Sequence, residues 1–296
     1  MSEPTARDVG EFGLIAAVTA RLSSSDAVLV GPGDDAALLS FPDGRVLATK
    51  DVLVEGVHFR RDWSTAYQVG RKAAAANLAD ISAMGGTATS LLIGLAAPAD
   101  LPLAWALELA DGLRDEAAVV GAVIVGGDTV RSEAIVISVT ALGQLTGEPV
   151  TRSGARAGDL VVLAGRQGWS SAGLEQLNEG ITTGPLVDAH RSPTPPYAMG
   201  PALAAAGASA MCDVSDGLVA DLGHIARASG VRIELDSALL PDDVPLRHVL
   251  LGGEDHALVA TIAHPAEGCR IIGQVAAGEG VFVDGEAVAE GWEHFR

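Results

Sequence analysis

Aspartate is the residue type in this chain with the clearest potential for chemistry, because it recurs in short segments that contain glycine or serine. Five such segments read GPGDDAA, TKDVLVEGVHF, NLADISAMGG, GGDT and CDVSDGL. They contain Asp34, Asp35, Asp51, Asp80, Asp128, Asp213 and Asp216. Carboxylates that converge on small-residue turns need a positive partner, and Mg²⁺ is the simplest one because it prefers oxygen ligands. The pattern therefore predicts aspartates that bind Mg²⁺ together with an anionic ligand.

The first of these segments also matches, formally, the G-x-G-x-x-A turn of dinucleotide-binding folds. Pro32 removes a backbone N–H from that turn, and Asp34 and Asp35 would face the pyrophosphate that such a turn binds. Two like charges about 4 Å apart repel by roughly 4 kcal/mol at an effective dielectric constant of about 20. A bridging Mg²⁺ reverses that repulsion, so we interpret the segment as a metal-binding loop. An Asx turn or a helix N-cap is the alternative.

Asp80 and Asp128 are further candidates for metal ligands. Asp80 is flanked by Ala, Ile and Met, and its nearest basic neighbours, Arg71 and Lys72, are about two helical turns away, too far for an i,i+4 pair. Asp128 follows the apolar run AVIVGG, and we expect it where that strand ends. The alternatives are a structural aspartate at residue 80 and a loop cap at residue 128.

The segment from Asp213 to Gly217 has the spacing of a helix N-terminus, with Asp213 or Ser215 as the cap and Asp216 in the first turn. Taken alone, capping would explain it. Five such segments on one chain favour metal binding instead. His58, which follows the apolar residues LVEGV, is equally consistent with a core, surface or ligand-binding role.

Length, charge and composition narrow the class of protein. A chain of 296 residues exceeds the usual single-domain size, and 48% hydrophobic but only 4% aromatic residues are typical of Val-rich strands packed on Ala-rich helices. The net charge of −19 argues against binding to nucleic acid or anionic lipid, although it is also consistent with a role in solubility alone. Cys212 and Cys269 lack the spacing of a zinc site, and no apolar run reaches the length of a membrane span. We therefore expect a cytoplasmic α/β protein.

Hydrophobic periodicity and turn residues divide the chain into helices and strands. Residues 5–22 predict a helix, and residues 64–84 predict a long one, with Ser64 as N-cap and with Asn77 and Asp80 on one face. Strands are expected at 27–31, 45–51, 89–96, 122–127, 134–145, 158–165, 231–235, 256–262 and 269–275, and helices at about 102–120 and from about 198, after the proline-rich loop 191–197. The pattern restarts after residue 148, which predicts domains at 1–148 and 149–296.

Several familiar catalytic motifs are missing from the sequence. It has no G-x-x-x-x-G-K-[ST] loop, no HRD or DFG segment and no G-x-S-x-G elbow. Any use of ATP is therefore not through a Walker loop, the signature of protein kinases is missing, and the sequence argues against a serine hydrolase of the elbow type.

Taken in order, eight segments resemble the thiamine-monophosphate kinase family across almost the whole chain. They are GPGDDAA, TKDVLVEGVHF, NLADISAMGG, GGDT, RSGARAGD, CDVSDGL, GGEDHAL and the terminal GWEHF. The resemblance implies the two-domain α/β fold, with mixed sheets, that aminoimidazole ribonucleotide synthetase, selenophosphate synthetase and the hydrogenase-maturation protein HypE share. It also implies a dimer formed through strands of the N-terminal domain, which would carry the metal and ATP site. The implied activity is ATP-dependent phosphorylation of thiamine monophosphate to thiamine diphosphate in the cytoplasm.

The resemblance also implies roles for individual residues. Ligands of a cluster of several Mg²⁺ ions would be Asp34, Asp51, Asp80, Asp128, Asp213, Asp216 and Thr49. The position after Thr49, where the family often has Thr or Ser, is Lys50, which could take part only through its backbone carbonyl. ATP contacts would be Gly127, Arg152 and Ser215, and contacts to thiamine monophosphate would be His58, Glu254 and Trp292. No catalytic general base is implied.

Two alternatives to a kinase remain open on the sequence. Another ATP-using synthetase or maturation factor of the same superfamily is one, but the N-terminal Cys or selenocysteine of selenophosphate synthetases and the C-terminal Cys of HypE are both missing. A non-catalytic protein that binds Mg²⁺ and nucleotide is the other. Loss of Asp51, Asp128 or Arg152 would indicate it, and all three residues are present.

Overall fold

The computed structural model describes residues 5–30 and 38–288, and the chain divides into two compact units. Unit 1 comprises Met1–Ile81 and Thr87–Gln144. Unit 2 comprises Ser82–Gly86 and Leu145–Arg296. Both units combine helices with sheets, which confirms the expected mixed α/β class.

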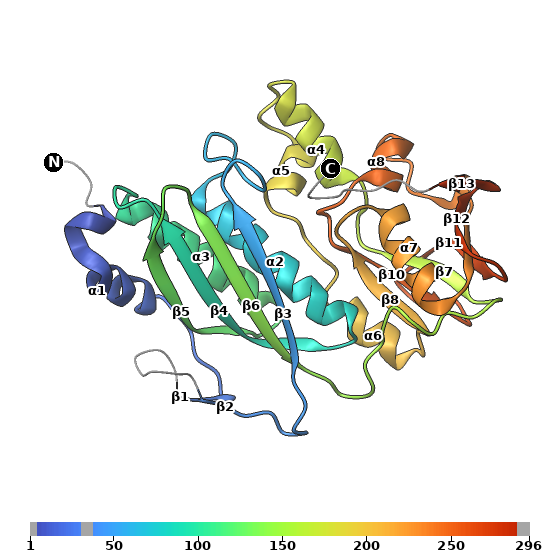
Figure 1. Ribbon diagram of the computed structural model, residues 1–296, viewed down its shortest axis with the longest axis horizontal. Coiled ribbons are helices and arrows are strands. Elements are labelled where there is room, and N and C mark those ends of the chain that lie inside the picture. The colour runs from blue at the N-terminus through green and yellow to red at the C-terminus, as the bar shows by residue number, and fades with distance from the viewer. Residues whose placement is uncertain (1–4, 31–37, 289–296) are drawn as a thin grey trace. The chain divides into compact units, whose positions relative to one another are not determined.

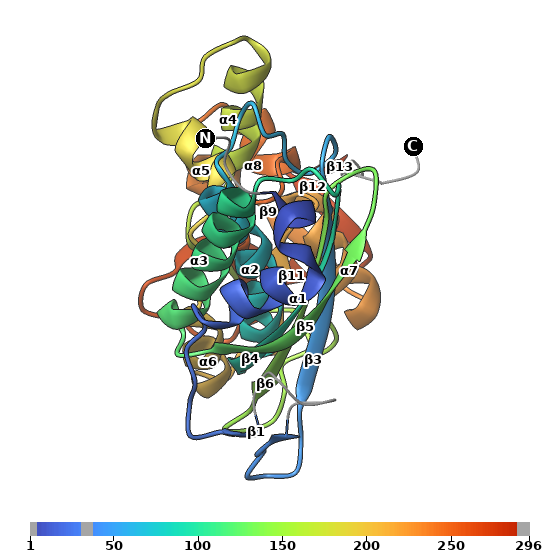
Figure 2. The same cartoon turned by 90° about the vertical axis from the view of Figure 1, so that its left-hand side faces the viewer.

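Unit 1 is built on a four-stranded sheet in the order β3-β6-β4-β5. Its elements are α1 (Ala6–Thr19), β1 (Val28–Val30), β2 (Leu38–Leu39), β3 (Leu47–Val54), α2 (Ala66–Ala83), β4 (Thr87–Ala97), α3 (Leu103–Val119), β5 (Val123–Arg131) and β6 (Val136–Gln144). The strand β4 pairs with β5 in parallel and with β6 in antiparallel orientation. Helices α2 and α3 cover one face of this sheet (Figures 1 and 2).

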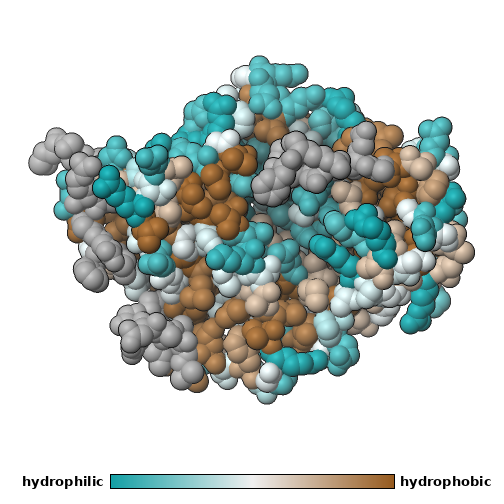
Figure 3. Space-filling view, viewed as in Figure 1, coloured by the Kyte–Doolittle hydropathy of each residue, from teal (hydrophilic) through white to brown (hydrophobic). Residues whose placement is uncertain are grey.

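Alternation along the strands separates a buried face of this sheet from an outer one. On β6 every second residue from Ile137 onward is buried against the helices. The outer face carries the exposed apolar side chains Val52, Leu92 and Val130. Hydrophobic residues are correspondingly visible over the strands of unit 1 (Figure 3).

The two helices behind the sheet cross closely because glycines face each other at the crossing. A Cβ on Gly112 of α3 would lie 2.1 Å from the carbonyl oxygen of Tyr67, and one on Gly70 of α2 would lie 2.3 Å from that of Leu109. The prediction of Ser64 as the N-cap of α2 is wrong by one residue. Thr65 takes that place in a capping box, since Thr65 Oγ1 accepts from Gln68 N at 3.2 Å and Gln68 Oε1 accepts from Thr65 N at 3.0 Å.

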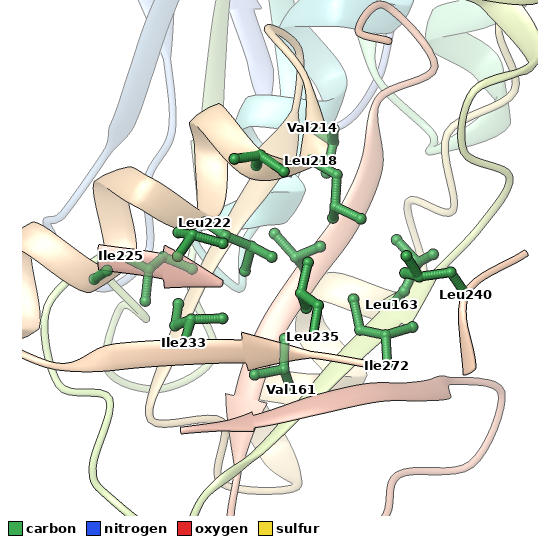
Figure 4. Packing of buried hydrophobic residues seen from close by; sticks show 14 of the residues in the cluster. Val161, Leu163, Val214, Leu218, Leu222, Ile225, Ile233, Leu235, Leu240 and Ile272 are labelled. Carbon is green, nitrogen blue, oxygen red and sulfur yellow. The ribbon is translucent and has the colours of Figure 1, made fainter. Parts of the chain in front are cut away.

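Unit 2 is built on a seven-stranded mixed sheet in the order β13-β12-β9-β11-β7-β10-β8. Its elements are β7 (Leu160–Ala164), α4 (Trp169–Asn178), α5 (Pro185–Arg191), α6 (Met199–Ala205), β8 (Ala210–Val214), α7 (Leu218–Ser229), β9 (Arg232–Leu235), the 3₁₀ helix η1 (Ser237–Leu239), α8 (Leu246–Leu251), β10 (Ala257–Ile262), β11 (Arg270–Ala276), β12 (Gly280–Val283) and β13 (Glu286–Val288). Leu218, Leu222 and Ile225 of α7 pack on the sheet and form its main core with strand residues such as Val161 and Ile233 (Figure 4).

Two expectations about the aspartate segments are wrong. The strand expected at 122–127 does not end before Asp128, because β5 continues through Asp128 to Arg131. Asp213 is not at a helix start but within β8, and α7 begins only at Leu218, with Gly217 at the N-cap position and no capping side chain. In both cases backbone pairing with a neighbouring strand extends the strand beyond its apolar part. Among the described residues, no helix is both long enough and apolar enough to cross a membrane.

Candidate functional site

In unit 1 the strand β3 and the helix α2 bring three of the expected ligands together. Thr49 Oγ1 donates a hydrogen bond of 2.6 Å to Asp80 Oδ2. The backbone N–H of Asp51 donates to Asn77 Oδ1 at 3.1 Å, and Asn77 Nδ2 donates to the carbonyl of Ala73. Asn77 and Asp80 are three residues apart and therefore share a helix face. Thr49 and Asp80 therefore meet through their side-chain oxygens, and the backbone of Asp51 is tied to the same face of α2.

Lys50 does not join these residues through its side chain. Thr49 and Asp51 are partly buried on the helix side of β3, whereas Lys50 is exposed on the other side of the strand, as alternation requires. Any contribution of Lys50 to a site that contains Thr49 and Asp51 is therefore made by its backbone.

Asp128 lies on the opposite edge strand of the sheet. The strand register aligns Asp51 with Val139, Ile93 and Gly127 in one row. It aligns Asp128 with Gly94 and Ser138 in the next row, which belongs to the outer face. The sheet of unit 1 therefore holds Asp128 apart from Thr49, Asp51 and Asp80.

Gly127 is required by the close approach of β5 to β4. A Cβ at this position would lie 2.0 Å from the carbonyl oxygen of Ile93. The neighbouring Asp128 is exposed, and its Oδ1 accepts from the N–H of Thr129 at 2.8 Å. The GGDT segment thus has two glycines, whose backbone no side chain covers, followed by one exposed carboxylate in the last part of an edge strand.

His58 lies in a turn that follows β3. Its Nδ1 accepts a hydrogen bond of 3.0 Å from the N–H of Val54, so a neutral imidazole carries its proton on Nε2. The buried Lys72 of α2 donates from Nζ to the carbonyl of His58 at 3.1 Å. The turn therefore presents His58 as a hydrogen-bond donor.

In unit 2 the carboxylate of Asp213 is buried at the end of β8. Its Oδ2 lies 3.0 Å from Nδ1 of His256, which is also buried. The backbone N–H of His256 donates to the carbonyl of Val214, and its φ of +52° lies in the left-handed region. The imidazole thus orients one oxygen of the expected metal ligand.

The loop after β8 is organised by Asp221 in the first turn of α7. Asp221 Oδ2 accepts from the N–H groups of both Ser215 and Asp216, each at 3.0 Å. Burial, and then the negative charge of Asp213, raise the pKa of Asp221 to about 7, while the hydrogen bond from Asp216 opposes the shift. Three carboxylates therefore interact around one short loop, an arrangement that a cation would stabilise.

Glu254 lies beside this loop, in the GGED segment that precedes β10. Its N–H donates to the carbonyl of Ser215 at 3.0 Å, and its φ of +65° is again left-handed. A Cβ on Gly253 would lie 1.8 Å from the same carbonyl oxygen, so only glycine fits there. Asp255 accepts from Gly168 N at 2.8 Å and from Ser170 N at 2.9 Å. The segment is thereby fixed on both sides of Glu254.

Arg152 lies in the same part of unit 2. Burial, followed by the positive charges of Arg152 and Arg227, lowers the pKa of His224, and the charge of Asp216 acts in the opposite direction. Arg152 and Asp216 are therefore both within electrostatic range of the His224 ring. Arg152 is exposed, so its guanidinium is open to an anionic ligand.

Two of the expected residues, Asp34 and Trp292, lie outside the described residues. Within residues 5–30 and 38–288, no three His, Cys, Asp or Glu side chains converge as a complete metal cage. The groups that the units do provide are all oxygen donors, the type that Mg²⁺ prefers.

Sequence reasoning missed the residues that hold the candidate ligands in place. They are Asp221, Asp255 and His256, and His190 lies beside Glu254, with its Nδ1 3.7 Å from Oε2. Asp255 and His256 are adjacent to the expected Glu254, and a charged pair directly before an apolar strand was the available signal. Nothing in the local sequence marks Asp221 or His190, because their partners come from distant segments.

Comparison with known proteins places these observations in context. The family model for the AIR synthase related protein, N-terminal domain, matches residues 33–145, and the model for its C-terminal domain matches residues 156–286. A thiamine-monophosphate kinase of Mycobacterium tuberculosis (strain ATCC 25618 / H37Rv) is 49% identical over 311 residues, which cover 99% of this chain and 93% of that protein.

Solved structures show the same similarity. The crystal structure of thiamine-monophosphate kinase from Stenotrophomonas maltophilia K279a has a TM-score of 0.81 at 33% identity and covers 93% of this chain and 95% of its own. A structure described as AaThiL complexed with AMPPCP and TMP has a TM-score of 0.80 at 37% identity and covers 98% of both chains.

Proposed function

Since the chain belongs to the thiamine-monophosphate kinase family, we propose that it transfers the γ-phosphate of ATP to thiamine monophosphate and forms thiamine diphosphate. The observation that carries this proposal is 49% identity to a thiamine-monophosphate kinase over 99% of the chain. The structure with an ATP analogue and TMP, at a TM-score of 0.80, supports the choice of both substrates.

The chemistry requires two polyanions to meet. A phosphate oxygen of thiamine monophosphate attacks the γ-phosphorus of ATP, the bond to the β,γ-bridging oxygen breaks, and ADP leaves. The attacking oxygen is already anionic at neutral pH, so no general base is needed. The main tasks of the protein are to hold both phosphates in line and to offset their charge.

Oxygen donors of both units fit Mg²⁺ by their chemistry. Thr49, Asp51 and Asp80 of unit 1 and Asp213 and Asp216 of unit 2 would hold the ions, with Asp34, Asp128 and the carbonyl of Lys50 as further ligands. Bound Mg²⁺ would neutralise phosphate charge and favour an in-line transfer.

The remaining residues would bind the two substrates directly. Arg152, the Ser215 loop and the bare backbone at Gly127 would contact ATP. His58 would donate from Nε2 to an acceptor on thiamine monophosphate, which the hydrogen bond from Val54 N to its Nδ1 supports. Glu254 would face the cationic thiazolium and Trp292 would stack on a ring of the substrate.

Homodimer formation and a cytoplasmic location complete the proposal. The exposed apolar side chains Val52, Leu92 and Val130 on the outer face of the unit 1 sheet support a dimer through these strands. Size-exclusion chromatography with light scattering tests it, and a monomer at all concentrations would contradict it.

The activity is tested by ³¹P NMR of the purified protein with ATP, Mg²⁺ and thiamine monophosphate, with EDTA as a control. We expect a new pair of diphosphate signals and ADP, both of which require Mg²⁺. ADP without thiamine diphosphate would indicate another acceptor. A folded protein without turnover would favour a non-catalytic role in binding nucleotide.

A further inference from the structure

Two consecutive serines at the start of α4 each contact a buried histidine. Ser170 Oγ lies 3.1 Å from Nδ1 of His190, and Ser171 Oγ lies 2.9 Å from Nδ1 of His248. His190 is 5% exposed and His248 is 7% exposed. The chain thus provides two serine–histidine pairs of nearly equal burial at one helix terminus.

The two pairs differ in the carboxylate that the imidazole approaches. Nε2 of His248 lies 3.0 Å from Glu175 Oε2, on the solvent side of α4, where Arg247 also donates to both oxygens of Glu175. Nδ1 of His190 lies 3.7 Å from Oε2 of Glu254. Only the pair of Ser170 and His190 therefore reaches a residue expected to contact the substrate.

The backbone at Glu254 is fixed, so the side-chain neighbours decide where its carboxylate points. The left-handed φ and the bond from its N–H to the carbonyl of Ser215 fix the main chain of Glu254 itself. The carboxylate of the next residue, Asp255, accepts two backbone N–H bonds from the start of α4 and ties the segment to that helix. The carboxylate itself is partly exposed, with His190 buried beside it. A donor on this inner side would hold the carboxylate in one rotamer.

We propose that His190 is a positioning residue that orients the carboxylate of Glu254 toward the cationic part of thiamine monophosphate. This inference rests on the proposed function and extends it. When the proton of the imidazole is on Nδ1, this N–H lies close to both Ser170 Oγ and Glu254 Oε2. The attraction between that N–H and the carboxylate restricts Glu254 before the substrate binds, which reduces the entropy lost on binding.

The test compares His190→Leu with His248→Leu, which removes the matched serine–histidine pair but leaves Glu254 untouched. Steady-state kinetics are measured for each substrate, and thermal unfolding confirms that each variant is folded. We expect His190→Leu to raise the KM for thiamine monophosphate about tenfold and to leave the KM for ATP within about twofold. His248→Leu should leave both KM values within about twofold.

A third variant, His190→Asn, keeps an N–H donor close to the position of Nδ1. It should retain a KM for thiamine monophosphate within about threefold of the wild type, and it decides the question if the leucine variant does not fold. The inference would be overturned if His190→Leu and His248→Leu changed the KM for thiamine monophosphate equally, or if His190→Leu changed the KM values for both substrates equally. A KM for thiamine monophosphate in His190→Asn as high as in His190→Leu would also overturn it. A folded wild type without kinase activity would instead overturn the proposed function and this inference with it.

Discussion

Thr49 and Asp80 are joined by a hydrogen bond of 2.6 Å from the threonine hydroxyl to Oδ2 of the aspartate, across 31 residues of sequence. The bond connects the strand β3 to the helix α2, and the bond from Asp51 N to Asn77 Oδ1 connects the same two elements a second time. The carboxylate of Asp80 is therefore held in a defined direction by a side chain that also offers an oxygen of its own.

Removing this hydroxyl should weaken metal binding. In Thr49→Val the side chain keeps its shape but no longer orients Asp80, and loss of such a supporting bond typically reduces metal affinity by about 10- to 100-fold. We expect the Mg²⁺ concentration for half-maximal activity to rise by at least about tenfold. Thr49→Ser, which keeps the hydroxyl, is the control, and identical Mg²⁺ dependence in the two variants would contradict the role.

Asp128 offers a separate test of the proposed ligands. Because Asp128 is proposed as a metal ligand, Asp128→Ala should reduce activity by at least roughly 100-fold. Because the residue is exposed, the unfolding temperature of this variant should stay near that of the wild type. Ser138→Ala, in the same cross-strand row, should retain activity. Normal turnover of the Asp128 variant would remove this residue from the mechanism.

The hydrogen bond from Val54 to His58 predicts which amide can replace the imidazole. A glutamine places its N–H₂ group near the position of Nε2, whereas an asparagine places it near Nδ1, which faces the N–H of Val54. His58→Gln should therefore keep a lower KM for thiamine monophosphate than His58→Asn. ¹⁵N NMR of the wild-type ring should show the Nε2–H tautomer, and a proton on Nδ1 would refute the assignment.

Asp255 should make the stability of unit 2 depend on pH. Burial raises the pKa of this carboxyl to about 7, against the hydrogen bonds from Ser170 and Gly168. Between about pH 4 and pH 7 the folded state then binds more protons than the unfolded state, so the free energy of unfolding falls as the pH rises through this window. Asp255→Asn lacks this titration and should lose less stability from pH 5 to pH 7. Unfolding curves in EDTA test this, and parallel pH profiles would contradict it.

The crossing of α2 and α3 should not tolerate a methyl group. Alanine gains about 1 kcal/mol of helix propensity over glycine. The Cβ of Gly112→Ala would nevertheless lie 2.1 Å from the backbone of Tyr67, and such overpacking costs about 1–3 kcal/mol. We expect a lower unfolding temperature for Gly112→Ala and no comparable loss for Gly147→Ala, where no atom lies within 4 Å. Equal unfolding temperatures would show that the helices can separate without cost.

Several features of the fold followed from local sequence alone. The helices α2 and α3 and the strands β3, β4 and β6 lie close to their expected positions. Each is a long segment, and the hydrophobic periodicity of a long segment predicts its secondary structure well. Errors arose where pairing with a distant strand decided the outcome. The polar GGDT segment remains in β5 because β4 pairs with it, and Asp213 lies in β8 because β10 does.

The sequence by itself determined the family, the α/β class and the set of oxygen-bearing residues, because these depend on residue types and their order. Tertiary structure decided which of these residues meet. It joined Thr49 to Asp80 and placed Lys50 and Asp128 on the other face of the sheet. It also placed His256 beside Asp213 and His190 beside Glu254. These partners lie tens of residues apart, and only the register of the strands and the packing of the helices on them bring such positions within the distance of a hydrogen bond or an ion pair.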